Sequence, residues 1–323
     1  MTRPLGLAFV GCGAATERHS RTLRAMGAAV HLQYASRDAA KAESARGRFG
    51  GTRAYGSYEA AWSSPDVDAV VLATPPHLHL EQTLAALAAG KHVIVEKPAF
   101  PAVEAFEKVR EASTRSGKRV FVAENYVYKP LAGVLRRVLA RGDVGDPLLV
   151  LVDAVKLQRP VGWRADRALM GGGGLLEGGI HWVSFMASLG LEPRDVRGFR
   201  AGPSPESTTE ETVVAVFEYE GGAVGALSFS WQVPSPMRGV RISRIYGREG
   251  TVRFESNGLF VFVHGRRTGL HVPGIRDLAG HRAMFHDFFD AIRTGREPLM
   301  TLDLAERDVR LVSRIYASMQ ARP

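Results

Sequence analysis

Continuous apolar runs alternate with amphipathic stretches through the first part of the chain, and this pattern restricts the fold more than any other feature. The runs are Leu5–Val10, Val30–Ala35, Ala69–Ala73, His92–Glu96 and Arg119–Ala123. Segments with helical periodicity, such as Glu81–Ala89 and Val103–Ser116, lie between them. Strands that are apolar throughout and joined by helices are typical of a parallel sheet covered on both faces. Residues 1–124 are therefore predicted to form an α/β domain.

The pattern changes after Glu124. Several strands with period-two patterning follow at short spacing: Leu148–Val155, Thr212–Tyr219, Ala223–Trp231, Val240–Tyr246, Thr251–Glu255 and Leu259–His264. Strands this close together are best joined as an antiparallel meander. One helix is expected at Glu177–Leu189, and a later helix places apolar side chains at helical spacing, predicted to be core: Met284, Phe285, Phe288, Phe289 and Ile292. Residues 125–323 are predicted to form a second, α+β domain.

Composition excludes several classes of protein. No apolar stretch reaches the roughly 18 residues of a membrane span, and the N-terminus leads directly into the first strand, so no signal peptide is expected. Cys12 is the only cysteine, so a cytoplasmic location is expected. The net charge of +9 is spread along the chain without a basic block, so no nucleic-acid partner is expected. That charge indicates either attraction of anionic ligands or an arginine-rich solvated surface.

A glycine turn follows the first predicted strand. Gly11-Cys12-Gly13-Ala14-Ala15-Thr16 stands between that strand and a helical pattern that continues through Met26. The first glycine permits a tight turn, and the second lets the backbone approach a pyrophosphate at the helix N-terminus. Thr16 replaces the third glycine of the dinucleotide fingerprint. A dinucleotide cofactor is predicted to bind here, at Gly11, Gly13, Ala14 and Ala15.

The end of the second predicted strand indicates which dinucleotide is preferred. An acidic residue there would bind the ribose 2′-hydroxyl of NAD, whereas arginine accommodates the 2′-phosphate of NADP. The chain reads Ser36-Arg37-Asp38 at this point. Ser36 and Arg37 favour NADP as the cofactor, while Asp38 keeps NAD open or serves as the N-cap of the next helix.

Three groups that can move a proton stand in two distinct segments. Lys97 follows Glu96 at the end of a predicted parallel strand, the edge of an α/β sheet at which ligands bind. Glu177 and His181 follow the run Gly171–Gly174, whose glycines permit close approach to a ligand. Their spacing of four residues places them on one helix face. Lys97 and His181 are predicted to be catalytic, with His181 as general base or acid and Glu177 orienting a hydroxyl or tuning the histidine.

With these motifs in place, the chain resembles the glucose–fructose oxidoreductase, inositol dehydrogenase and rhizopine-catabolism family, Gfo/Idh/MocA. The motifs that carry the resemblance are GCGAATERH, ATPPHLH, VEKP, AENYVYKP and GGGGLLEGGIH. The resemblance implies a Rossmann domain followed by an open, mostly antiparallel sheet. It also implies NAD(P)-linked hydride transfer at a hydroxyl or keto carbon of a sugar, nucleotide sugar or cyclitol, and a cis Lys97-Pro98 bond. The chain departs from the family pattern at Glu177, usually Asp, and at Pro76, often Asn.

The resemblance extends to further residues near the cofactor and the substrate. It places Thr74, Pro75 and His79 beside the cofactor, with Glu96 as a ribose-side or structural partner. His77 and His79 lack a third ligand, so no metal is predicted. Substrate contacts are expected from Glu124, Asn125, Trp163 and Arg164 besides Glu177 and His181, although Trp163 and Arg164 equally fit a role in anchoring their loop.

The expected reaction joins residues of both predicted domains. His181 takes the hydroxyl proton with the help of Lys97 while hydride passes to the nicotinamide, so the active site is expected between the domains. The sequence leaves two alternatives open, a non-enzymatic dinucleotide-binding sugar sensor and an NAD-dependent glycosidase. The exposed face of a broad antiparallel sheet predicts a homodimer or homotetramer.

Overall fold

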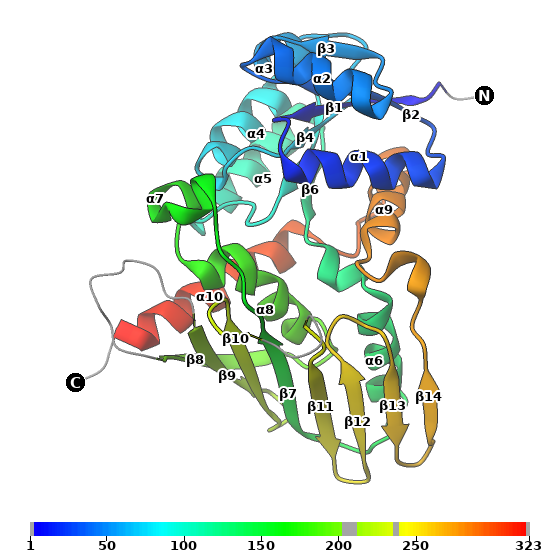
Figure 1. The fold of residues 1–323 in the computed structure, drawn as a ribbon, viewed down its shortest axis with the longest axis vertical. Coiled ribbons are helices and arrows are strands. Elements are labelled where there is room, and N and C mark those ends of the chain that lie inside the picture. Colours follow the sequence, from blue (N-terminus) through cyan, green and yellow to red (C-terminus); the bar gives the residue numbers. More distant parts are fainter. Residues whose placement is uncertain (1–2, 202–211, 235–238, 321–323) are drawn as a thin grey trace. The chain divides into compact units, whose positions relative to one another are not determined.

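The computed structural model describes residues 3–201, 212–234 and 239–320 (Figure 1). The chain divides into two compact units. One comprises Met1–Ala123 and Met284–Glu306, and the other comprises Glu124–Ala283 and Arg307–Pro323. The division predicted after residue 124 falls next to the start of the second unit. Residues 284–306, expected in the second domain, belong instead to the first unit.

A six-stranded parallel sheet forms the centre of the first unit, as predicted. Its order is β3-β2-β1-β4-β5-β6, from β1 (Leu5–Val10), β2 (Val30–Ala35), β3 (Arg53–Tyr55), β4 (Ala69–Leu72), β5 (His92–Glu96) and β6 (Val120–Ala123). The order reverses direction between β1 and β4. At such a switch point the carboxyl ends of the strands leave a crevice for ligands. The glycine turn follows β1 and Lys97 follows β5, so both lie at the carboxyl edge of this sheet.

Helices accompany these strands along the chain and bury their apolar faces. They are α1 (Ala14–Met26), α2 (Ala39–Phe49), α3 (Tyr58–Trp62), α4 (His79–Ala88), α5 (Glu104–Ser116) and α9 (His281–Thr294). Figure 1 shows α4 and α5 side by side. Met284, Phe285 and Phe288 of α9 are fully buried, and the ring of Phe288 lies 5.0 Å from that of Phe121 in β6. The prediction of core positions is confirmed for these three side chains, whereas Phe289 and Ile292, also predicted to be core, are only partly buried.

An eight-stranded sheet forms the second unit, in the order β14-β13-β12-β11-β7-β10-β9-β8. The strands are β7 (Pro147–Val155), β8 (Pro193–Arg200), β9 (Thr212–Tyr219), β10 (Val224–Ser230), β11 (Ile242–Gly247), β12 (Gly250–Glu255), β13 (Val261–His264) and β14 (Gly269–His271). Every neighbouring pair is antiparallel except β7 and β10. The predicted meander is therefore wrong at this central pair, because β8 and β9 enter the sheet between β7 and β10 in the chain.

Helical segments accompany this second sheet. They include η2 (Asn125–Tyr128), α6 (Pro130–Ala140), η3 (Gly162–Ala165), α7 (Arg167–Met170), the π-helix η4 (Leu175–Gly179), α8 (Ile180–Ala187), η6 (Ile275–Asp277) and α10 (Leu302–Gln320). The residues of α10 from Arg307 onward belong to the second unit. In the described part of the chain, no helix is long and apolar enough to cross a membrane.

Alternating side chains give the second sheet one buried and one open face. In β9, Val213, Ala215 and Phe217 are fully buried, whereas Val214 between them is 36% exposed. The same alternation in the other strands exposes further apolar side chains, among them Leu149, Val224, Ile242 and Phe262. The buried face supports the helices that carry the candidate site, and the open face is partly apolar.

Candidate functional site

The glycine turn after β1 has the geometry that a phosphate group requires. Gly11 has a φ of +95°, and a Cβ built on it would lie 2.9 Å from the carbonyl oxygen of Ala73, so only glycine fits. Gly13 is the N-cap of α1 and supplies no side-chain cap. A Cβ at Gly13 would meet nothing within 4 Å. The start of α1 is thus open to a ligand, and its amides and dipole favour a pyrophosphate.

Thr16 explains why the third glycine of the fingerprint is dispensable in this chain. Its hydroxyl donates a hydrogen bond to the carbonyl oxygen of Gly11, and the residue is 1% exposed. The side chain therefore folds back onto the turn and closes it from inside the helix. A β-branched residue is accommodated where close helix–strand packing usually requires glycine.

Arg37 and Asp38, at the end of β2, differ in whether the described part of the chain already engages their side chains. The carboxylate of Asp38 accepts hydrogen bonds from the amides of Ala40 and Lys41 and thereby caps α2. This is the alternative role that the sequence left open for Asp38. Arg37 is exposed and forms no ion pair or hydrogen bond with any residue in the described ranges. Its guanidinium is therefore available to a ligand.

His79 lies in the core of the first unit and bonds only to main-chain atoms among the contacts found. Its Nδ1 lies 3.1 Å from the carbonyl oxygen of Pro98 and 3.0 Å from that of Ala99, and its Nε2 lies 2.9 Å from that of Thr74. The ring is fully buried, and burial lowers the pKa of His79 although the three carbonyls raise it. The ring thus ties the loop after β4 to the loop after β5, where Lys97 lies.

Lys97 is half-buried at the end of β5, and the cis Lys97-Pro98 peptide bond is confirmed. The backbone amide of Lys97 donates to Oε2 of Glu96 at 3.1 Å. The other oxygen of Glu96 bonds to Nε2 of His19 in α1. Burial raises the pKa of Glu96, but the hydrogen bond with His19 and nearby positive charges outweigh it and hold the pKa well below its ordinary value. Glu96 therefore stays ionised and fixes the backbone that carries Lys97.

His181 forms a close pair with Glu124 within the second unit. Its Nδ1 lies 2.8 Å from each carboxylate oxygen of Glu124. The carboxylate is 2% exposed and also accepts the amide of Tyr126 at 2.9 Å. The Tyr126 ring stacks on the imidazole with the centroids 4.5 Å apart. Because Nδ1 donates to a carboxylate, neutral His181 carries its proton there and its basic lone pair on Nε2.

Glu177, the carboxylate expected to orient a hydroxyl or tune His181, forms an ion pair with Arg164. Its Oε1 accepts from Nε of Arg164 at 2.9 Å, and its side chain is 4% exposed. The guanidinium of Arg164 lies over the ring of Trp163 at 4.8 Å. Glu177 also lies in the π-helix η4, whereas His181 is the second residue of the regular helix α8. The structure thus links the predicted substrate residues Trp163, Arg164 and Glu177 into one chain of contacts.

The glycines around Glu177 satisfy local packing in this structure. A Cβ on Gly172 would lie 2.6 Å from Leu176, and one on Gly178 would lie 2.4 Å from the ring of Trp231. The hydroxyl of Tyr316 accepts the amides of Gly173 and Leu176 at 3.2 and 3.0 Å. The run therefore has a packing reason beside the ligand approach expected from sequence.

Asn125 is held by the main chain next to the Glu124–His181 pair. The residue is 5% exposed, and its Nδ2 donates to the carbonyl oxygen of Ala279 at 2.6 Å. This bond anchors η2, the short helix that follows Glu124 and carries Tyr126. The structure therefore shows a local structural role for Asn125.

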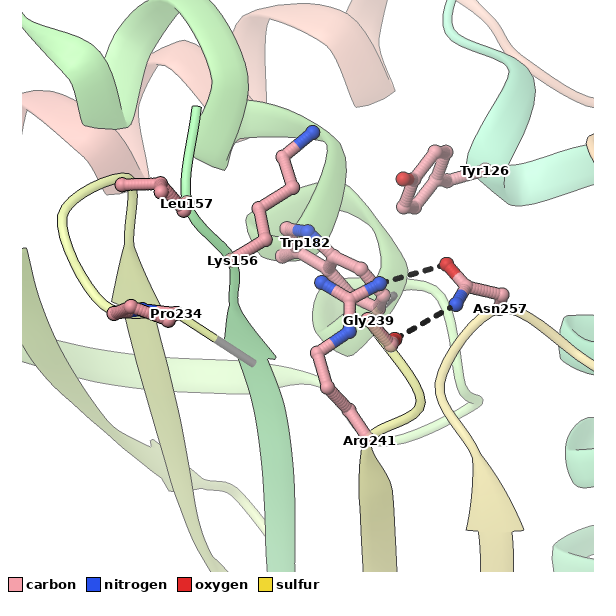
Figure 2. Close-up of a pocket in the computed structure, with 8 residues that line it drawn as sticks. All are labelled: Tyr126, Lys156, Leu157, Trp182, Pro234, Gly239, Arg241 and Asn257. Atoms are coloured by element: carbon pink, nitrogen blue, oxygen red, sulfur yellow. Dashed lines mark hydrogen bonds between the residues drawn. The ribbon is translucent and has the colours of Figure 1, made fainter. Parts of the chain in front are cut away.

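A pocket of about 450 Å³ in the second unit contains residues that the sequence argument did not single out (Figure 2). It is lined by Tyr126, Lys156, Leu157, Trp182, Pro234, Gly239, Arg241 and Asn257. Trp182 directly follows His181, and Tyr126 belongs to the AENYVYKP motif, so these two had a sequence signal. Arg241 stands just before β11 and Asn257 just after β12, and no sequence motif marked either residue. Among the described residues, no cluster of three or more His, Cys, Asp or Glu side chains could hold a metal ion.

Comparison with known proteins agrees with this geometry. The family model described as "Oxidoreductase family, NAD-binding Rossmann fold" matches residues 5–124, and the GFO/IDH/MocA C-terminal domain matches residues 134–253. The bovine trans-1,2-dihydrobenzene-1,2-diol dehydrogenase is 31% identical over 227 residues, which cover 69% of this chain and 67% of that protein. The alignments with the rabbit and mouse enzymes of that name cover 59% of their length, less than two thirds.

A bacterial relative and two solved structures extend the likeness. The levoglucosan dehydrogenase of Pseudarthrobacter phenanthrenivorans is 26% identical over 272 residues, 75% of this chain and 66% of that protein. A levoglucosan dehydrogenase crystallised with NADH and levoglucosan has a TM-score of 0.87 at 22% identity, covering 98% of this chain and 97% of the other. An oxidoreductase from Thermotoga maritima has a TM-score of 0.85 at 27% identity, covering 98% and 97%. The chain belongs to the GFO/IDH/MocA family of oxidoreductases with an NAD-binding Rossmann fold.

Proposed function

We propose that the protein transfers a hydride between a nicotinamide dinucleotide and a hydroxyl or keto carbon of a sugar, nucleotide sugar or cyclitol. The observation that carries the proposal is the bond between Nδ1 of His181 and the buried Glu124 carboxylate. This arrangement prepares Nε2 as a proton acceptor. Relatives named dehydrogenases of levoglucosan and of a dihydrobenzenediol support a substrate with neighbouring hydroxyl groups.

In the direction of oxidation, the hydroxyl proton passes to Nε2 of His181. The Glu124 carboxylate stabilises the imidazolium that forms, as an acidic partner does in other histidine-based sites. The ammonium of Lys97 donates to the same hydroxyl oxygen and stabilises the negative charge that develops on it. A nicotinamide dinucleotide, when bound, would supply the acceptor for the carbinol hydride. Reduction runs these proton steps in reverse.

The dinucleotide is proposed to bind at the carboxyl edge of the parallel sheet. Gly11, Gly13 and the first amides of α1, at Ala14 and Ala15, hold the pyrophosphate, and Thr74 and Pro75 flank the cofactor. Ser36 and Arg37 hold a ribose 2′-phosphate, so NADP is the preferred form. The occupied state of Asp38 as a helix cap supports this preference. The related levoglucosan dehydrogenase was crystallised with NADH, so NAD is the competing form.

The remaining site residues are proposed to position these groups. Glu96 and His79 hold the loop of Lys97 through the hydrogen bonds described above. Glu177 orients Arg164, whose unused guanidinium N–H groups bind substrate hydroxyls while Trp163 lines the substrate's path. Asn125 keeps η2 in place beneath His181.

The open face of the eight-stranded sheet is proposed to join two or four copies of the chain. It exposes Leu149, Val214, Val224 and Phe262 to between 36% and 42%, and such a partly apolar sheet face is a natural isologous interface. Light scattering of the purified protein tests this. A dimer or tetramer is expected, and a monomer at micromolar concentration would contradict it.

A turnover screen tests the proposed reaction. The protein is incubated with NAD or NADP and a panel of sugars, nucleotide sugars and inositols, and the absorbance of reduced nicotinamide is followed. Net production of NADH or NADPH is expected with at least one polyol. A sensor would bind cofactor without turnover. A glycosidase that re-reduces its substrate would release sugar without net reduced cofactor.

A further inference from the structure

Two buried cations lie against the ring of Trp182 without a carboxylate partner. Arg241 is 6% exposed and Lys129 is 4% exposed. The Arg241 guanidinium lies 5.3 Å and the Lys129 ammonium 5.5 Å from the centroid of the Trp182 ring. No ion pair joins either cation to another residue within the described ranges. Buried charges that lack a partner are costly, so a pair of them in one place calls for a compensating ligand.

The hydrogen bonds of these two side chains are few and neutral. Nη2 of Arg241 donates to the amide oxygen of Asn257 at 2.7 Å, while its buried Nε has no hydrogen-bond partner among the described residues. The Lys129 ammonium donates to the carbonyl oxygen of Ser256 at 3.3 Å. An arginine fork offers five N–H donors, and the contacts seen use one of them.

The buried carboxylate of Glu255 offsets the charge of the pair in part, since burial lowers the pKa of Lys129 and Glu255 raises it by a smaller amount. Its hydrogen bonds, however, go to other groups. Glu255 is fully buried. One oxygen accepts Nδ2 of Asn257 and the amide of Arg241, and the other accepts the amides of Asn257, Gly258 and Leu259. Its carboxylate shapes the β12–β13 turn. Among the described residues, Glu255 bonds to the main-chain amide of Arg241 and to none of its guanidinium N–H groups, so those that Asn257 leaves unused stay available to a ligand.

This pocket adjoins the proposed general base. Figure 2 shows the Arg241 guanidinium beside Trp182, the Lys156 stem above it and Tyr126 on the opposite wall. Tyr126 is the residue whose ring stacks on His181. A ligand in the pocket would thus contact aromatic rings and the cationic side chains of Arg241 and Lys156. Only the Tyr126 ring would separate it from His181. Aromatic faces suit a sugar ring, and a guanidinium suits a carboxylate or phosphate.

We propose that this pocket recognises an oxyanion, a carboxylate or a phosphate, carried by the sugar or polyol whose hydroxyl His181 deprotonates. The inference rests on the proposed function and narrows its substrate class to acidic sugars. Arg241 and Lys156 donate to the oxyanion, and Asn257 holds the guanidinium at the required angle. A neutral sugar offers no charged acceptor to the guanidinium N–H groups that Asn257 leaves unused, and it is therefore the poorer substrate.

The test compares matched compounds that differ in charge. Glucose, glucuronate and glucose 6-phosphate are assayed with the preferred cofactor in the unmodified protein and in Arg241→Gln, Lys156→Gln and Arg244→Gln. Arg244 is the control, because it lies three residues after Arg241, within β11, and is exposed. The kcat/KM for one acidic sugar is expected to exceed that for glucose, and the Arg241 substitution to lower this ratio by on the order of 30-fold or more. Whichever acidic compound is preferred shows whether carboxylate or phosphate is recognised.

Two results would overturn the inference. One is equal or better turnover of glucose, and the other is an unchanged preference in both Arg241→Gln and Lys156→Gln. Lys156 is exposed, so its substitution keeps the test usable should the Arg241 variant fail to fold.

If no sugar is turned over, the proposed function fails. Calorimetry then tests separately whether the pocket binds an acidic sugar. Glucuronate and glucose 6-phosphate are then titrated into the cofactor-loaded protein. Binding that the Lys156 or Arg241 substitution weakens supports the pocket, and absence of binding contradicts it.

Discussion

Nδ1 of His181 lies 2.8 Å from both carboxylate oxygens of Glu124, a residue 57 positions earlier in the chain. The carboxylate is buried, and the amide of Tyr126 helps to fix it. Glu124 touches the imidazole, so it acts on the reaction by setting the tautomer and orientation of His181. This relationship makes Glu124 the positioning residue of the proposed proton relay.

Replacing Glu124 by Gln is expected to lower kcat on the order of 10²- to 10⁴-fold, because an amide that donates to Nδ1 places the imidazole proton on Nε2. The KM and the cofactor dissociation constant should change little, which distinguishes mispositioning from unfolding. Steady-state kinetics measure kcat and KM separately. Glu218→Gln, at a partly exposed glutamate of β9, is the control. In the double variant with His181→Asn, the Glu124 substitution should add no further loss, and additive losses would show that the residues act independently.

Arg37→Gln is expected to weaken NADP binding by roughly 10- to 100-fold, the size of a lost charge-assisted hydrogen bond. NAD binding should change much less, because NAD lacks the 2′-phosphate. Fluorescence titration with both cofactors measures the dissociation constants, with the exposed Arg115→Gln as control. Tighter binding of NAD than NADP by the unmodified protein would refute the proposed preference.

Gly280→Ala is expected to destabilise the second unit by about 3 kcal/mol or more. Gly280 has a φ of +78°, and a Cβ there would lie 2.7 Å from backbone atoms of Asn125, Tyr128 and Lys129, which cannot yield. Gly222→Ala is the matched control, because it has a φ of +82° but open space around the added carbon, and should cost only about 1 kcal/mol. Urea unfolding followed by tryptophan fluorescence compares them, and equal losses would contradict the steric argument.

The free energy of unfolding is expected to vary with pH in the alkaline range because of Lys129. Burial lowers the pKa of Lys129 to about 8 from 10.5. Between these values the unfolded chain holds a proton that the folded chain has lost, so this residue's contribution to the free energy of unfolding rises with pH, by about 3 kcal/mol in all. The difference in that free energy between unmodified protein and Lys129→Met should rise accordingly from pH 7 to pH 10.5. The exposed Lys108→Met should leave a flat difference, and an equally flat difference for Lys129→Met would disprove the shift.

The parallel sheet could be predicted closely because burial on both faces leaves a continuous apolar run. β1, β2 and β5 begin and end where the sequence placed them. β8 was missed because its sequence PRDVRGFR buries only Val196 and Gly198. The short β3 and β14 were missed for the same lack of a pattern. The pairing of β7 with β10 depends on contacts far apart in the chain, which local patterning does not contain.

The site shows the same limit. The residue types were predictable, since Lys97, Glu124, Glu177 and His181 all stand in recognisable motifs. Their ion-pair partners were not predictable, because no sequence motif indicated that Glu177 pairs with Arg164 or that His181 pairs with Glu124. Spacing along a regular helix predicts which side chains lie on the same face. The π-helix at Glu177 and the loop that carries Arg164 determine which side chain Glu177 contacts.

The proton relay itself can be tested in one set of rates. The absorbance of reduced nicotinamide is followed with the best polyol of the screen for the unmodified protein, Lys97→Ala and His181→Ala. Each substitution is expected to lower kcat on the order of 10²-fold or more, while the cofactor dissociation constant stays within a few-fold of its original value. Normal turnover in either variant would contradict the assignment of Lys97 and His181 as the groups that move the proton.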